Sequence, residues 1–421
     1  MSSGLLLLLL VGLALLATHV VSDWVARKLV VVSGAEYLVI GVLLGPAVFG
    51  VLTEAQLVQF APVRLLVLGF IGLALGMRCR LSALVGVPGI AWRLAFSQAF
   101  LTLATVAALT AVLLGAINGT SVADAVPPAI ALGAIAVVSL PQAVEVGARA
   151  LGREGPTVEL LRTATLVDGL VGVCTFGMLL ALNHPAVAGL GRTPTPTEWA
   201  VIATGIGVAS GVLFHLFIGS ESSSDRVVVS LAGATLLATG AAAHLGLSPL
   251  YSTTVMGAIL VNTSRHRDVL EGILRRAERP LVFVMLILAG ATWRPGVGVA
   301  LVLPVLVYLL ARWVGKVGGA RFAARANGVL GIHGHDWGRA LLGQGSLALA
   351  IGFAWLENDN AVLPNLVFSA AVAGVLFTDL SAARTVRRVL EPLLPPEGAA
   401  ALTVGGPAEP AEPAGATGAG T

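Results

Sequence analysis

The sequence predicts an all-α polytopic membrane protein with about thirteen transmembrane helices. The first observation is composition: of 421 residues, 57% are hydrophobic and 11% are charged, and the mean hydropathy is +0.92. The second is that apolar segments of about 20 residues, the length that crosses a bilayer as a helix, follow one another along the chain. The third is an alternation of charge between successive loops. No soluble domain has this combination of properties.

The first predicted span is residues 4–21. The sequence MSSGLLLLLLVGLALLATHVV lacks a basic leader and a small-residue cleavage site, so we interpret it as a retained helix and not as a signal peptide. The later spans are expected at about 30–52, 57–77, 90–114, 127–147, 158–182, 199–218, 226–244, 248–261, 278–293, 297–316, 339–356 and 362–381.

Positive residues gather in every second loop, whereas the loops between them carry only the isolated Arg192 and Arg294. The positive-inside rule therefore places the N-terminus outside and the C-terminus in the cytoplasm, in a multi-pass protein of the cell membrane. The residues that carry this pattern are Arg27, Lys28, Arg78, Arg80, Arg149, Arg153, Arg226, Arg265, Arg267, Arg275, Arg276, Arg279, Arg321, Arg325, Arg384, Arg387 and Arg388.

The spans divide into two inverted six-helix repeats, about 4–182 and 226–381, joined by a linker helix at about 199–218. The fifth helix of each repeat contains helix breakers: Ser139-Leu140-Pro141-Gln142 in the first, Gly343-Gln344-Gly345-Ser346 in the second. Breaks at matching positions predict two crossing helices and a binding site near the midplane. We expect a transmembrane domain over 1–394 and a disordered cytoplasmic tail over 395–421, because the tail is rich in Ala, Pro, Gly and Glu.

Asp168 lies near the middle of the predicted span 158–182. A carboxylate at that depth costs about 2.5–3.5 kcal/mol on insertion scales and usually marks an ion or proton pathway. Desolvation favours the neutral acid, so such a group can exchange a proton for a cation. The alternative is a structural salt bridge or hydrogen bond inside the bundle.

Four stretches, in this order along the chain, resemble the monovalent cation:proton antiporter superfamily. EYLVIGVLLGPAVFGVL is similar to its Gly-Pro helix, and ALGAIAVVSLPQAVEVGARALGREG to the helix that usually carries Thr-Asp-Pro. LLRTATLVDGL resembles the helix that carries an Asn-Asp or Asp-Asp pair, and GAILVNTSRHRDVLEGILRRAERPLVFVMLILAG resembles a later passage. The resemblance covers about residues 25–385 and implies secondary transport and a homodimer.

By this resemblance, Asp168 matches the essential ion-binding aspartate of the family, and Ser139 and Pro141 match the Thr and Pro of its unwound stretch. Arg312 falls where the family has a membrane lysine or arginine that neutralises the site. Arg312 is expected either to pair with Asp168 or to cap a broken helix. The alternative is an arginine that reaches the cytoplasmic interface beside Lys316.

The chain departs from the family pattern at three positions. Leu140 replaces the aspartate of Thr-Asp-Pro, Val167 precedes the key aspartate where Asn or Asp is usual, and Ser346 stands where glutamate is usual. Gln344 and Ser346 fall near the Arg-Gly-Glu of the second broken helix. The sequence thus leaves one certain carboxylate in the site, and the departures put the usual form of sodium coordination in question.

The expected function is exchange of a monovalent cation, Na⁺ or K⁺, for H⁺, with Asp168 binding each in turn. Oxygen ligands would come from Asp168, Ser139, Thr165 and freed carbonyls. One carboxylate suggests one proton per cation. The residues expected to support the site are Pro141, Gln142, Arg312, Gln344, Ser346 and Glu145, although Glu145 is also explained as a solvated interfacial residue.

Alternative functions are a same-fold symporter or channel-like carrier for K⁺ or an organic anion, and a homologue that does not transport. An enzyme is disfavoured, because no second catalytic group can be placed near Asp168. We expect no cofactor and no nucleic acid partner.

His333-Gly-His335-Asp336 has no third His nearby and is interpreted as a solvated loop, not a metal site. The arginines of 265–279 indicate contact with anionic membrane lipid or topology setting.

Overall fold

The computed structural model describes residues 35–118, 121–152, 154–185, 194–218, 224–294, 299–329 and 336–391. The first predicted span and the predicted tail lie outside these residues. Within the described ranges the chain is helical and has no strand. Seven of its helical stretches are long and apolar enough to cross a membrane, so the chain is a multi-pass membrane protein.

Each predicted span from the second to the last contains a described helix, and the total of thirteen stays a prediction because the first span is not described. In the first half the helices are α2 (Ala35–Leu44), α3 (Glu54–Gln59), α4 (Ala61–Met77), α5 (Leu81–Leu84), α6 (Gly89–Asn118), α7 (Val122–Val137), α8 (Pro141–Leu151) and α9 (Pro156–Leu182). The second half contains α10 (Pro196–Ile218), α11 (Ser224–His244), α12 (Pro249–Thr263), α13 (Arg267–Thr292), α14 (Val299–Ala326), the 3₁₀ helix η1 (Trp337–Leu341), α16 (Gly345–Leu356) and α17 (Pro364–Leu390).

Local sequence signals set where several helices begin. Proline is the first residue of α8, α9, α12 and α17, a position where its missing N–H costs nothing. The side chain of Ser248 accepts a hydrogen bond from the backbone N–H of Tyr251 and so caps α12. Residues 267–279 of the arginine-rich segment form the first half of α13, and the helix continues without a break into the apolar span.

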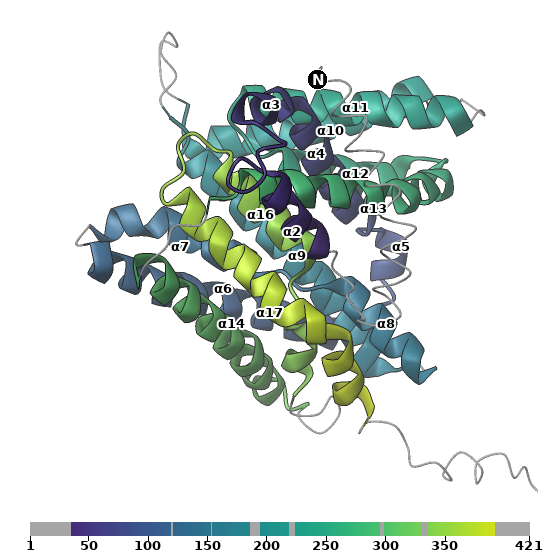
Figure 1. Cartoon of the computed structure of the whole chain (residues 1–421). Helices are drawn as coiled ribbons and strands as arrows, with labels where there is room; N and C mark the ends of the chain where they lie inside the picture. The colour runs from purple at the N-terminus through teal and green to yellow at the C-terminus, as the bar shows by residue number, and fades with distance from the viewer. Residues whose placement is uncertain are drawn as a thin grey trace, which may run out of the picture.

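The helices form two bundles (Figure 1). The core bundle consists of α6, α7, α8, α9, α14, η1, α16 and α17, and the flanking bundle of α2, α4, α10, α11, α12 and α13. The core bundle thus takes the fourth to sixth spans of each predicted repeat, as an arrangement of two related halves requires.

Small residues allow close helix contacts in the flanking bundle. α4 and α12 cross where Gly76 faces Gly257: a Cβ added at Gly257 would lie 3.0 Å from the Cα of Gly76. Such close approach replaces the hydrophobic driving force that lipid does not provide between helices.

The two bundles meet mainly where α9 and α16 pack against α4, α10, α12 and α13. Two polar links join them. Arg64 of α4 forms an ion pair with Glu357, the residue after α16. Trp293, the residue after α13, donates its indole N–H to Ser369 of α17 over 2.9 Å. Both links lie at the ends of the helices remote from the arginine-rich loops.

Candidate ion-binding site

Two unwound segments cross at the centre of the core bundle. α7 ends at Val137 and α8 begins at Pro141, while η1 ends at Leu341 and α16 begins at Gly345. The backbone N–H of Leu140 donates to the carbonyl of Gly343 over 2.8 Å and joins the two segments. Both predicted breaks are present, since Pro141 has no N–H to continue α7 and Gly345 has a φ of 75° that favours glycine.

Asp168 of α9 is completely buried beside this crossing. Its Oδ2 accepts hydrogen bonds from the Ser139 hydroxyl, 2.6 Å away, and from the Lys316 ammonium, 2.7 Å away. The Ser139 oxygen also lies 3.0 Å from the carbonyl oxygen of Leu341 in the second break. The structure thus brings Asp168 and Ser139 together as the sequence predicts.

Lys316 is the partner of Asp168, and the sequence analysis missed it. Its side chain is completely buried, and its ammonium contacts the Val137 carbonyl and the Ser139 hydroxyl in addition to Asp168. The alternative for Arg312, which placed Lys316 at the cytoplasmic interface, is therefore wrong. Arg312 and Lys316 are one turn apart on one face of α14, so spacing alone gives both access to the core, and only the position of α14 decides which reaches Asp168.

Arg312 takes the second of its two predicted roles, that of a cap for the broken helices. Its Nε donates to the carbonyl of Ala136 and its Nη2 to that of Val138, each over 3.1 Å. Its Nη1 donates to the carbonyl of Leu342 beyond η1. One planar guanidinium therefore satisfies freed carbonyls at the C-terminal ends of both interrupted helices, where the partial charge is negative.

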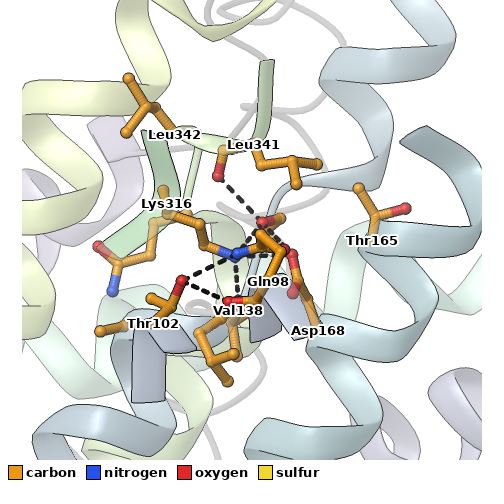
Figure 2. Close-up of polar contacts among 12 residues, drawn as sticks. Gln98, Thr102, Val138, Thr165, Asp168, Lys316, Leu341 and Leu342 are labelled. Carbon is orange, nitrogen blue, oxygen red and sulfur yellow. Dashed lines mark hydrogen bonds and ion pairs between the residues drawn. The ribbon is translucent and has the colours of Figure 1, made fainter. Parts of the chain in front are cut away.

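Gln98 of α6 is a further member of the site that sequence reasoning did not find. The side-chain amide makes hydrogen bonds through both its nitrogen and its oxygen when the nitrogen donates to Asp168 Oδ1 over 3.2 Å. The amide oxygen then accepts from the Lys316 ammonium over 3.3 Å and from the Thr102 hydroxyl over 2.9 Å. The side chains of Gln98, Asp168 and Lys316 converge in Figure 2. A lone glutamine in an apolar helix gives no motif, although its burial in a membrane protein requires partners.

Asp379 of α17 is a second buried carboxylate next to the crossing. Its Oδ1 accepts from the backbone N–H of Gln344 over 2.7 Å, and its Oδ2 from that of Gly345 over 3.0 Å. The side chain of Gln344 donates to the Tyr308 hydroxyl and, over 3.2 Å, to the Ile135 carbonyl. The sequence analysis did not identify this second carboxylate near the crossing.

The side-chain hydrogen bonds of Thr165 and Glu145 go to groups other than Asp168. The Thr165 hydroxyl donates to the backbone carbonyl of Arg162 one turn back, over 2.9 Å, although Thr165 lies next to the cluster. Glu145 pairs with the guanidinium of Arg162 over 2.8 Å in a partly exposed ion pair, which agrees with the interfacial interpretation.

A cleft lies between the two bundles on the side of the arginine-rich loops. Arg78 of α4 and Glu278 of α13 line it on the flanking bundle, and Ser139 and Thr165 on the core bundle. The cleft is also lined by the predicted site-supporting residues Pro141, Gln142, Gln344 and Ser346. Asp168 does not line the cleft; it lies behind Ser139 and Thr165.

No group of three His, Cys, Asp or Glu side chains suited to a metal occurs within the described parts of the chain. His333 and His335 lie outside those parts. Asp336 forms ion pairs with Arg321, at 2.7 Å, and with Arg339, at 3.2 Å.

Comparison with known proteins finds similarity in structure but not in sequence. No family model and no curated protein matches the sequence. The solved structure of the sodium proton antiporter MjNhaP1 from Methanocaldococcus jannaschii at pH 8 superposes with a TM-score of 0.67 at 15% identity, over 93% of this chain and 98% of that one. An electron-microscopy structure of the same antiporter gives a TM-score of 0.64 at 15% identity, over 93% and 99% of the two chains. The chain therefore has the cation:proton antiporter fold.

Proposed function

We propose that this protein exchanges a monovalent cation for H⁺ across the membrane and that Asp168 binds the two in turn. The observation that carries the proposal is a completely buried aspartate at the crossing of two unwound segments. A buried carboxylate is costly unless it is paired, protonated or bound to a cation. The antiporter fold supports the same conclusion.

The surroundings of the Lys316 ammonium support binding of a monovalent cation. The ammonium lies among oxygen atoms of Asp168, Ser139 and Val137, and these are the hard ligands that Na⁺ or K⁺ requires. In this proposal the incoming cation replaces the ammonium at Asp168, and a proton replaces the cation in the return step. Thr165 completes the ligand set by turning its hydroxyl from the Arg162 carbonyl toward Asp168.

Alternating access follows from the two bundles. The cleft reaches Ser139 from the side of the arginine-rich loops, which we place in the cytoplasm. Arg64–Glu357 and Trp293–Ser369 close the opposite side. A shift of the core bundle against the flanking bundle would break these links and expose Asp168 to the other side.

We also propose that the protein lies in the cell membrane as a homodimer with its N-terminus outside. The arginines in 265–279 would contact anionic lipid headgroups on the cytoplasmic side. No cofactor is required, because ion replacement at Asp168 involves no covalent step.

The test is a flux assay in liposomes that contain the purified protein and a pH-sensitive dye. Addition of Na⁺, K⁺ or Li⁺ should move protons against the direction of cation flow, and the three ions give the preference. Asp168→Asn should lower the rate roughly a hundredfold or more, since a charge-paired ligand is worth about 3–5 kcal/mol.

Asp268→Asn makes the same chemical change in a side chain that is 84% exposed, and it should leave the rate unchanged. Proton movement in the same direction as the cation would instead establish symport. An Asp168→Asn variant as active as the parent would remove this residue from the site.

A further inference from the structure

The buried charges at the crossing balance only when Asp379 is included. Lys316 and Arg312 bring two positive charges, and Asp168 brings one negative charge. The start of α16 adds the partial positive charge of a helix N-terminus. Without Asp379 the region would repel the cation that the proposed function requires.

Asp379 lies where it can cancel this excess. The residue is 1% exposed. Its two carboxylate oxygens accept hydrogen bonds from the backbone N–H groups of Gln344, the N-cap residue, and of Gly345, the first residue of α16. The Thr378 hydroxyl also donates to it over 3.2 Å. By contrast, the start of α8 at Leu140 and Pro141 has no side-chain cap, so only one of the two half-helix N-termini is neutralised.

The first turn of α16 has no acidic residue of its own, and the negative charge next to it comes from α17. Ser346 is neutral and half-buried and lines the cleft at the first turn of α16. Asp379 supplies a carboxylate to that same turn from the neighbouring helix α17. The negative charge is thus at the helix end, while Asp168 remains the group in contact with the transported ion.

On the basis of the proposed exchange function, we infer that Asp379 is a positioning residue whose charge, through the α16 N-terminus and Arg312, sets the affinity of the site for both cation and proton. It does not bind the transported ion. Its removal makes the site more positive, so both the cation and the proton bind less tightly.

Asp379→Asn tests this, because the amide keeps the size of the side chain and one cap acceptor but removes the charge. The expected results in the liposome assay are a rise of about tenfold in the apparent KM for the cation at alkaline pH and a shift of the activity midpoint to lower pH. A role in helix capping alone would lower the maximal rate or the amount of folded protein and leave both quantities unmoved.

The rescue variant is Asp379→Asn with Ser346→Glu, which returns a negative charge to the first turn of α16 from within that helix. Recovery of the KM and of the pH midpoint supports the inference. An unchanged KM and midpoint in Asp379→Asn, or a rescue variant no better than Asp379→Asn, overturns it. If the parent protein shows no cation-driven proton flux at all, the proposed function fails and the role of Asp379 fails with it, which is a distinct result.

Discussion

Replacement of Lys316 by Gln should lower the free energy of unfolding, and the size of this loss relative to the parent should depend on pH. The change leaves the completely buried Asp168 carboxylate without its ion-pair partner at 2.7 Å. Removal of one partner of a buried pair costs about 3–5 kcal/mol. Asp168 can limit this cost by taking up a proton.

The loss of stability cannot much exceed the free-energy cost of protonating Asp168. That cost follows from the ordinary pKa of aspartate, about 3.9, at about 1.36 kcal/mol per pH unit. Protonation of the carboxyl at pH 7.5 costs about 4.9 kcal/mol, and at pH 5.5 about 2.2 kcal/mol. The stability deficit of Lys316→Gln is therefore about 3–5 kcal/mol at pH 7.5 and no more than about 2 kcal/mol at pH 5.5. The deficit shrinks as pH falls because the variant binds a proton on folding that the unfolded chain lacks.

The assay is thermal or denaturant unfolding of the purified protein in detergent at the two pH values, always compared with the parent at the same pH. The double variant Asp168→Asn with Lys316→Gln removes both charges and should be more stable than Lys316→Gln at pH 7.5, with a deficit that does not depend on pH. Equal deficits of Lys316→Gln at both pH values, or a double variant no more stable than the single one, would refute the reasoning.

Two further changes test the links between bundles and the packing of the second break. Glu357→Gln removes the ion pair with Arg64, so the side of the protein that this pair closes should open more often and the cleft should close more often. In a cysteine-free background, labelling of a cysteine placed at Ala74 in the cleft should therefore slow by several-fold. Labelling at the same rate as in the parent would contradict the proposal that this ion pair holds the two bundles closed. Gly374→Ala places a methyl group against the side chain of Gln344 in the second break, 2.9 Å from its Cδ. This overpacking should lower the transport rate and cost about 1–3 kcal/mol of stability. Unaltered stability and transport would show that the Gln344 side chain is free to move.

Residue patterns were sufficient to predict the two breaks and the buried aspartate that lies beside them. Ser139-Leu140-Pro141-Gln142 and Gly343-Gln344-Gly345-Ser346 lie at the observed breaks, because proline and a positive-φ glycine act on the backbone locally. Asp168 stood out because a carboxylate in the middle of an apolar span has few structural explanations.

The partners of Asp168 could not be found in the same way. Lys316 looked like an interfacial lysine near the end of its predicted span, but α14 continues to Ala326, so Lys316 lies well inside the helix. Gln98 and Asp379 belong to no motif, and each acquires its role only from the helix packed against it.

By itself the sequence determined the membrane class, the approximate spans, the two breaks and the central carboxylate, because hydropathy and backbone preference act over a few neighbouring residues. Only the tertiary structure decided that Lys316 pairs with Asp168, that Arg312 caps both interrupted helices and that Asp379 caps the start of α16. These roles depend on distances between residues far apart in the chain, since a buried charge takes as its partner whichever group the helix packing brings within reach.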